Sequence, residues 1–299
     1  MSEPCLSTAT APVPLRRAGA AEGAALSAWW LGQAGFLIEG RGLRVVVDAY
    51  LSDTLAVKYR GKPFPHVRMM PPPVDPAEVR DVDLVLCTHG HTDHLDPGTL
   101  APLAAASPGC RFVVPAAHAA LALSRGVPAD RLVAASAFAE LEVAGVPIHP
   151  LPSAHEDLAV DASGQHLFLG YVLELAGAVV YHSGDCVPYP DLAAHLARYP
   201  VELALLPVNG RDARRAAGGV PGNFTLEEAM ELAAGCRFGA VIGHHFGMFD
   251  FNTIDPEAAR ARIAARPELP AFLLAEPGVR YDVRSGTRPP VEARGTIAP

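Results

Sequence analysis

Short apolar runs bounded by glycine, proline or polar clusters recur along the chain, and such runs are typical of buried β-strands. Residues 28–40 and 43–51 form the first two runs, and the glycines at positions 40 and 42 predict the turn that joins them. Further strands are expected at 82–88, 111–115, 140–151, 166–175, 177–182, 201–208 and 239–245. One or two more are expected near the end of the chain.

Helices are predicted between several of these strands, at 97–107, 116–125, 225–235 and 255–265. Thr225 is followed three residues later by Glu228, which is the pattern of a capping box, and Gly235 is placed to end that helix. Asp255 and Pro256 form the start of the last helix. The alternation of strands and helices predicts α/β layers. We find no linker and no internal repeat, so a single domain is expected.

Two segments lack periodicity. Residues 1–26 are rich in Ala, Pro, Ser and Thr, and we expect a mobile or loosely packed N-terminal arm before a domain over 27–299. Residues 52–76 contain six prolines and predict a long loop. Long loops in compact domains are often lids or binding loops.

Composition narrows the class of protein. Half of the 299 residues are apolar and 19% are charged, as in an ordinary globular protein. The net charge of −8 argues against a nucleic-acid partner. The five cysteines are scattered and form no CxxC pair, so neither a disulfide framework nor a zinc finger is expected. Neither a membrane span nor a secretory signal is evident, and we expect a cytoplasmic protein with no membrane partner.

The segment THGHTDHLDP follows the predicted strand at 82–88 and contains four potential metal ligands, His89, His91, Asp93 and His94. On an extended segment His89 and His91 point to the same side. The spacing can therefore serve two adjacent metal positions, one at each pair of ligands. A divalent metal needs more ligands than a pair supplies, so the rest must come from elsewhere in the chain.

Three further candidates each lie just beyond an apolar strand, namely His155, Asp185 and His245. Functional sites in α/β folds gather where strand ends meet, and a carboxylate such as Asp185 can bridge two cations. A single histidine near a strand end is usually packed or solvent-facing, and we interpret the following that way: His66, His118, His149, His166 and His195. Three imidazoles crowded beside a carboxylate instead favour a metal site.

Several stretches together resemble the metallo-β-lactamase superfamily. HGHTDH, a later histidine, SGD and a final strand-end histidine carry the resemblance to the superfamily as a whole. WWLGQAGF, MPPPVDP, VYHSGD and HHFGMFDFNT are similar to the branch that contains L-ascorbate-6-phosphate lactonase. These stretches extend from residue 29 to residue 253, which is most of the chain.

The resemblance implies a metallo-β-lactamase-type αββα four-layer sandwich with two divalent metal ions, Zn(II) or Mn(II), at one edge. It implies that His89, His91 and His155 surround the first metal. Asp93, His94 and His245 surround the second, and Asp185 lies between them. Alignment on the following Phe-Gly favours His245 over His244 as the ligand. A mononuclear or unequally loaded site stays an alternative.

Such metals lower the pKa of a bound water toward about 7 and supply hydroxide for attack on a carbonyl or phosphoryl centre. Asp93 can orient that hydroxide or accept its proton, and no serine or cysteine nucleophile is required. Cys87 and Cys186 are interpreted as inert core residues.

Specificity is expected from loops. Asn209 and Arg211 follow a buried strand and are our candidates for substrate binding, because arginine suits a carboxylate or phosphate. For Arg214 and Arg215, a role in substrate binding and a place in a solvated basic loop are equally good interpretations. The 52–76 loop, with Lys58 and Lys62, is a candidate lid.

The leading hypothesis is a lactonase-like metal-dependent hydrolase that acts on a small anionic lactone or ester. A phosphodiesterase on the same scaffold is the first alternative. A non-hydrolytic metal-binding protein is the alternative of another class, and a redox role with iron is weaker. A homo-oligomer would be unsurprising in this branch.

Overall fold

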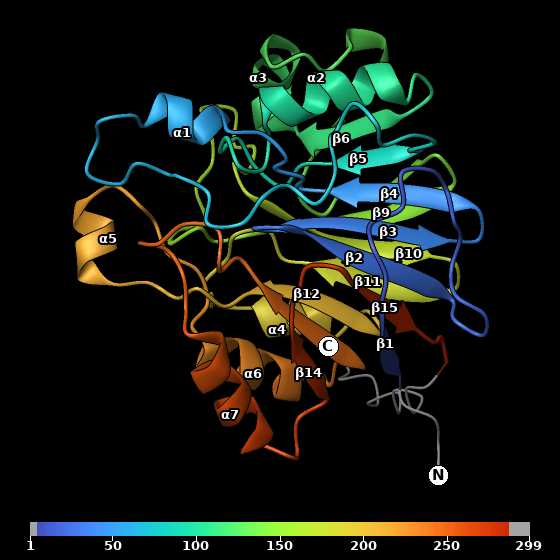
Figure 1. Ribbon diagram of the computed structural model, residues 1–299, viewed down its shortest axis with the longest axis vertical. Helices are drawn as coiled ribbons and strands as arrows, with labels where there is room; N and C mark the ends of the chain where they lie inside the picture. The colour runs from blue at the N-terminus through green and yellow to red at the C-terminus, as the bar shows by residue number, and fades with distance from the viewer. Residues whose placement is uncertain (1–4, 287–299) are drawn as a thin grey trace, which may run out of the picture.

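Two β-sheets packed face to face form the centre of the computed structural model, which describes residues 5–286 (Figure 1). The first sheet has the order β1 (Leu6–Thr10), β15 (Val279–Val283), β2 (Leu26–Gly32), β3 (Gly35–Gly40), β4 (Leu43–Val47), β5 (Leu84–Leu86), β6 (Arg111–Pro115) and β7 (Leu132–Ala135). The second has the order β14 (Ala271–Leu274), β13 (Ala240–His244), β12 (Leu203–Pro207), β11 (Ala178–His182), β10 (Leu169–Leu175), β9 (Val146–Pro152) and β8 (Leu141–Val143).

Helices cover the outer faces of both sheets. The α-helices are α1 (Thr54–Lys58), α2 (Pro97–Ala106), α3 (Ala119–Ser124), α4 (Leu192–Leu196), α5 (Ala213–Ala217), α6 (Leu226–Cys236) and α7 (Pro256–Ala264). Figure 1 shows α2 and α3 beyond the first sheet and α4, α6 and α7 beyond the second. The predicted α/β αββα sandwich is confirmed. Across residues 5–286 we find no helix with the length and apolar character to cross a bilayer.

The first sheet is buried on both of its faces. Trp30, Phe36 and Ile38 pack in the core between the sheets, whereas Trp29 and Leu37 pack under α2 and α3. Neighbouring residues alternate between the two sides because successive side chains of a strand point to opposite faces. This double burial explains why these strands have continuous apolar runs in the sequence.

Strand direction decides where the connecting loops meet. β4, β5, β6 and β7 are parallel, as are β11, β12, β13 and β14. β9 is antiparallel to β10, and β10 is antiparallel to β11, so β9 runs in the same direction as β11. The carboxyl ends of β9, β11, β12 and β13 therefore lie at one edge of the second sheet.

The N-terminal segment differs from the predicted mobile arm over 1–26. Leu6–Thr10 forms β1, which pairs antiparallel with β15, and Leu6 lies opposite Val283. Leu6 and Val13 are both buried. The prediction is wrong for these residues because their partner strand lies at the other end of the chain, where no local pattern reveals it. Residues 1–4 lie outside the described part.

The predicted strand at 28–40 is two strands joined by a tight turn. Gly32 and Gln33 both have positive φ, at +93° and +52°, and the indole nitrogen of Trp30 donates to the Gln33 carbonyl over 2.9 Å. Asp48, with φ +45°, ends β4 at Val47 rather than at residue 51. Three short elements, β7, α4 and α5, were absent from the pattern, as was α1 inside the 52–76 loop.

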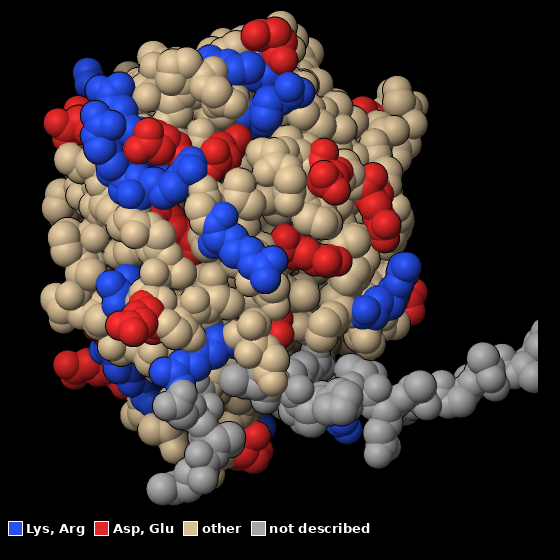
Figure 2. All heavy atoms as spheres, turned by 90° about the vertical axis from the view of Figure 1, so that its right-hand side faces the viewer, with Lys and Arg blue, Asp and Glu red and all other residues tan. Residues whose placement is uncertain are grey.

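Charged side chains are mixed in sign on the face turned away from α1 and α5. Figure 2 shows basic and acidic groups interspersed there. This face presents no continuous field of a single sign.

Candidate metal centre

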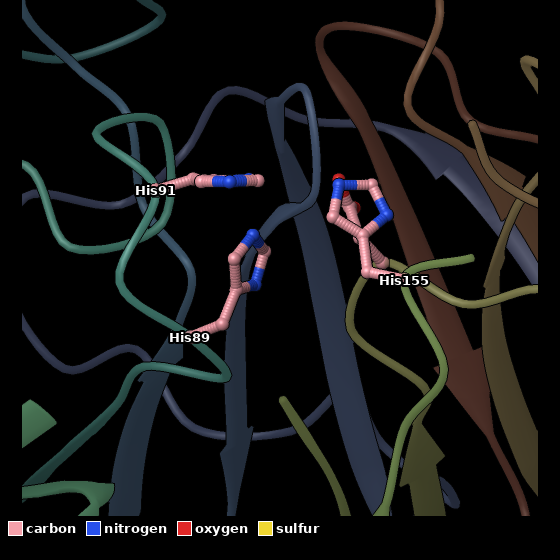
Figure 3. Close-up of side chains that lie close together, drawn as sticks. His89, His91 and His155 are labelled. Atoms are coloured by element: carbon pink, nitrogen blue, oxygen red, sulfur yellow. The ribbon is translucent and has the colours of Figure 1, made fainter. Parts of the chain in front are cut away.

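All seven predicted ligands converge at the edge where the strand ends meet. His155 lies three residues beyond β9, Asp185 three residues beyond β11, and His245 directly after β13. The remaining four come from the loop after β5 in the other sheet. Figure 3 shows His89 and His91 approaching from one side and His155 from the other. Residues as far apart in the chain as His89 and His245 therefore share one site.

The side chains form two groups, each with ligand atoms within 4.8 Å of one another. The first group contains His89, His91, His155 and Asp185, and the second contains Asp93, His94 and His245. The resemblance implies the same two sets of histidines and Asp93, with Asp185 between the sets rather than in the first.

Asp185 lies between the groups. Its Oδ1 is 3.1 Å from Nε2 of His245 and 3.4 Å from Nε2 of His94. Its Oδ2 is 3.6 Å from Nε2 of His155. One oxygen therefore faces each group, which is the arrangement of a bridging carboxylate.

Neighbouring groups hold the Nδ1 atoms of three histidines, so that Nε2 points inward. His94 Nδ1 lies 2.7 Å from Asp48 Oδ2, and His155 Nδ1 lies 3.1 Å from the Gly222 carbonyl oxygen. His89 Nδ1 lies 3.0 Å from the hydroxyl of Thr88, which itself donates to Asp48. Such partners fix the ring orientation of metal-binding histidines.

Gln33 connects two of the ligands. Its carbonyl accepts from the backbone N–H of His245, and its side-chain amide donates to Oδ2 of Asp93, both over 2.9 Å. Sequence reasoning missed both Gln33 and Asp48. A lone carboxylate in the apolar run 43–51 was the signal that could have identified Asp48. Gln33 gave no comparable signal.

The ionisation of His89, His155 and Asp185 suits metal binding. Burial, followed by the repulsion of neighbouring histidines, lowers the pKa of His89 well below its usual value. Burial also lowers the pKa of His155 to about 4. For Asp185 burial acts in the opposite sense, but His245 and His94 hold its pKa well below the usual value. Neutral imidazoles and an ionised carboxylate are the forms that bind metals.

Buried polar atoms without hydrogen-bond partners also indicate that the cluster can hold metal ions. Nε2 of His89, His94 and His245 and Oδ1 of Asp185 are buried without a hydrogen-bond partner. Buried polar atoms without partners are costly, and these four point into one cluster. The donor set is therefore compatible with a dinuclear metal site.

His244 lies apart from the cluster. Its ring packs between the sheets, 5.3 Å from the ring of Phe36 and 5.2 Å from that of His182. His245, with φ +67°, turns its side chain the other way, toward Asp185. The geometry therefore favours the second histidine of the pair.

A cavity of about 170 Å³ opens beside the two groups. The 52–76 loop forms one wall with Lys58, Tyr59, Lys62, Phe64 and His66. The rest of the lining includes Gly218–Pro221, Phe249 and Asn252. His66, interpreted above as a bystander, stacks on Tyr59 with 4.2 Å between ring centroids and so shapes this cavity.

Arg211 and Asn209 do not line the cavity. Arg211 forms a two-pronged ion pair with Glu228, with donor–acceptor distances of 2.7 and 2.6 Å. Asn209 is buried and donates to Asn252, which does reach the cavity. Arg215 is buried as well, whereas the exposed Arg214 lies over the ring of Phe64. Sequence reasoning separated Asn209 and Arg211 from Arg214 and Arg215, but it did not reveal the contacts that each side chain makes.

Comparisons with known proteins agree with this architecture. Residues 43–246 match the family described as the beta-lactamase superfamily domain. A metal-dependent hydrolase of the UPF0173 group from Methanosarcina mazei is 28% identical over 253 residues, which covers 82% of this chain and 94% of the relative. A member of the same group from Methanopyrus kandleri is 29% identical over 260 residues, covering 85% and 98%.

Solved structures share the fold. The isothiocyanate hydrolase from Delia radicum gut bacteria is 19% identical with a TM-score of 0.68, covering 85% of this chain and 97% of that one. Igni18, a metallo hydrolase from Ignicoccus hospitalis, is 19% identical with a TM-score of 0.61, covering 85% and 96%. Since the matched family spans more than half of the chain and includes every residue of the two groups, the chain belongs to the metallo-β-lactamase superfamily.

Proposed function

We propose that this protein is a metal-dependent hydrolase with two divalent ions, Zn(II) or Mn(II), and that it acts on a small anionic lactone or ester. The observation that carries the proposal is the position of Asp185, with Oδ1 toward His94 and His245 and Oδ2 toward His155. A carboxylate held in this way is suited to two cations about 3.5–4 Å apart. The relatives named as metal-dependent hydrolases support the reaction class.

Divalent ions bound in such a site lower the pKa of water and polarise the oxygen of an ester or phosphoryl group. His89, His91 and His155 would hold one ion, Asp93, His94 and His245 the other, and Asp185 both. Imidazole and carboxylate ligands suit zinc and manganese alike, so the donor set admits either metal.

Asp93 is the residue we assign to the attacking water. Its carboxylate lines the cavity and is held through Oδ2 by the Gln33 amide. Burial acts to raise its pKa, but the neighbouring imidazoles of His94 and His245 outweigh this and lower it. A carboxylate that stays ionised is better suited to orient water by accepting a hydrogen bond than to store a proton.

Two lysines support the preference for an anion. Lys58 and Lys62 are the only lysines of the chain, and both line the cavity. Over residues 5–286 no carboxylate forms an ion pair with either of them, and Lys58 Nζ lies 3.4 Å from the Thr92 hydroxyl. An unpaired ammonium group is a point charge for a carboxylate or phosphate. These lysines therefore take the role that sequence reasoning gave to Arg211.

Metal removal and a substrate panel test the proposal. The chain is stripped with a chelator and dialysed, and hydrolysis of lactones, carboxylate esters and bis(p-nitrophenyl) phosphate is measured before and after Zn(II) or Mn(II) is added. We expect no turnover without metal, and recovery on lactones or esters with metal. Full activity of the stripped chain would overturn the proposal. Turnover confined to the phosphodiester would replace lactone or ester hydrolysis with phosphodiesterase activity, and no turnover on any substrate would favour a non-hydrolytic metal-binding protein.

A further inference from the structure

The chain contains only three asparagines, and all three form one hydrogen-bonded row beside the cavity. The side-chain amide of Asn223 donates to Oδ1 of Asn209 over 3.1 Å. The amide of Asn209 donates in turn to Oδ1 of Asn252 over 2.7 Å. The three exposed fractions are 1%, 2% and 6%, so the row is buried along its length.

Arg215 sets the direction of this row. Its Nη1 donates to Oδ1 of Asn252, and because a guanidinium has no acceptor, the atom it meets must be the oxygen of the amide. Arg215 is itself fixed, since Nε donates to Oδ2 of Asp212 over 2.6 Å and Nη2 donates to the Asn209 carbonyl over 3.1 Å. The orientation of the Asn252 amide is therefore determined by its surroundings.

Two donors thus occupy the oxygen of Asn252, while its NH₂ group has no hydrogen-bond partner in the described structure. Asn252 lines the same cavity as His245 and Asp93. We propose that the side-chain NH₂ of Asn252 donates a hydrogen bond to an oxygen of the substrate, with Arg215 and Asn209 as positioning residues. This inference rests on the proposed function, because it concerns the substrate of the same site.

The chemistry of the donor limits the ligand. An amide N–H requires an acceptor, so the substrate carries a carbonyl, hydroxyl or carboxylate oxygen on the side of the cavity that Asn252 lines. A substrate with a methyl or methylene group at that place leaves the amide unpartnered inside the cavity, which disfavours its binding. Asn252 therefore selects substrates with an oxygen acceptor at this place, while the two lysines that line the same cavity select for charge.

Hydrogen exchange of the side-chain amides tests the inference without catalysis. The full chain is labelled with ¹⁵N-asparagine, which gives three side-chain NH₂ pairs, and the Asn252→Asp variant identifies the pair that disappears. We expect the NH₂ of Asn252 to exchange with solvent at least tenfold faster than those of Asn209 and Asn223, which donate within the row. Equal protection of all three pairs would show that Asn252 has a partner in the protein, and the inference would be wrong.

Kinetics test the contact with substrate. For a substrate that the metal-loaded wild type hydrolyses, Asn252→Ala should raise KM about tenfold and change kcat less than about twofold, since one neutral hydrogen bond is lost. Arg215→Met should raise KM in the same way, and Arg215→Lys should restore part of the loss. Gln165→Ala is the control, because that amide bonds to Ser136 outside the row.

Failure of the proposed function and failure of the inference about Asn252 give different experimental results. If the wild type hydrolyses none of the lactones, esters and phosphodiesters, the proposed function fails, while the exchange rates still decide whether Asn252 offers a free donor. If the wild type is active and Asn252→Ala keeps both its metal content and its KM, the inference alone is overturned.

Discussion

The imidazole of His94 and the carboxylate of Asp48 form a fully buried pair, with 2.7 Å between Nδ1 and Oδ2. The carboxylate also accepts from the backbone N–H and the hydroxyl of Thr88, over 2.8 and 2.6 Å. Asp48 therefore links the strand end of β4 to the ligand loop after β5. It fixes the His94 ring so that Nε2 faces Asp185.

Replacing Asp48 should weaken metal binding without removing any ligand. We expect Asp48→Ala to lower the affinity of the second group for Zn(II) or Mn(II) by roughly 10–100-fold, the effect typical of losing the partner of a metal-bound histidine. Titration of the metal-free chain, with elemental analysis of the reconstituted protein, measures it. Unchanged affinity would show that the loop holds His94 in place by itself.

Asp96 provides a matched control for Asp48. It is also buried, and it caps α2 by accepting from the Gly98 N–H over 3.1 Å and from the Thr99 hydroxyl over 2.6 Å. Asp96→Ala should lower the free energy of unfolding by about 1 kcal/mol, as loss of an N-cap does. It should leave the metal affinity within about twofold, because Asp96 contacts no ligand.

Loss of the bridging carboxylate should differ from loss of a single histidine. We expect Asp185→Ala to reduce the affinity for both metal ions, because its two oxygens face both groups. His91→Ala should reduce only the affinity of the first group. The measurement is the number of ions bound per chain across a titration. Equal loss in the two variants would contradict the placement of Asp185 between the groups.

The lysine pair should set the preference for charge. Lys58→Met and Lys62→Met should each raise KM for an anionic lactone or ester by roughly 10–100-fold, because each removes a hydrogen bond to a charged group. KM for an uncharged substrate of the same size should change less than about twofold. Added salt should narrow the difference in the wild type. Equal changes for charged and uncharged substrates would point to a loss of cavity shape instead.

The metal-free protein should lose stability as the pH falls. Burial lowers the pKa of His89 and His91, and that of His155 from 6.5 to about 4, so the unfolded chain takes up protons in this interval that the folded chain does not. The free energy of unfolding then decreases as pH falls from about 6.5 toward about 4. His94 acts in the opposite sense, because the neighbouring carboxylates outweigh burial and raise its pKa. Burial also lowers the pKa of five other histidines, namely His66, His118, His166, His182 and His244. The histidines with a lowered pKa therefore outnumber His94 and predict a lower Tm at about pH 5 than at about pH 7.5, and a Tm that is equal or higher at about pH 5 would contradict this.

The layers of the fold were predictable because each of the longer strands has a local signal in the sequence. Double burial gives continuous apolar runs, and the capping box at Thr225 and Glu228 forms as the pattern predicts. The short elements could not be predicted in this way. For example, α5 depends on the Asp212 cap and on contacts of Arg215, which leave no periodic pattern in the sequence. The pairing of β1 with β15 joins the two ends of the described chain and has no local signal.

Candidate ligands were predictable, whereas the residues around them were not. Histidines and aspartates directly after apolar runs are visible one at a time. Asp48, Gln33 and the asparagine row become meaningful only once separate loops meet. Arg211 shows this limit most clearly. The loop pattern could not reveal that the guanidinium of Arg211 is already paired with the carboxylate of Glu228, the acidic residue of the capping box.

Gly90, between His89 and His91, lies directly against the ring of His118. A Cβ atom built at Gly90 would stand 2.8–3.1 Å from three atoms of that ring. The ring is held in place, since its Nε2 lies 3.0 Å from the Leu167 carbonyl oxygen. The Gly90 carbonyl also accepts from Arg125 over 2.8 Å. Neither side of the contact can therefore move freely.

Gly90→Ala should consequently push the ligand loop away from His118 and displace the side chains of His89 and His91 from their positions in the first group. We expect at least about tenfold weaker metal binding by the first group, since ligands misplaced by a fraction of an ångström lose their geometry. His118→Ala alone should bind metal normally, because that ring contacts no ligand atom. The double variant should recover most of the lost affinity, because the smaller side chain leaves room for the new methyl group. If Gly90→Ala binds as tightly as the wild type, or if the double variant stays as weak as Gly90→Ala, steric contact with His118 is not what requires glycine at this position.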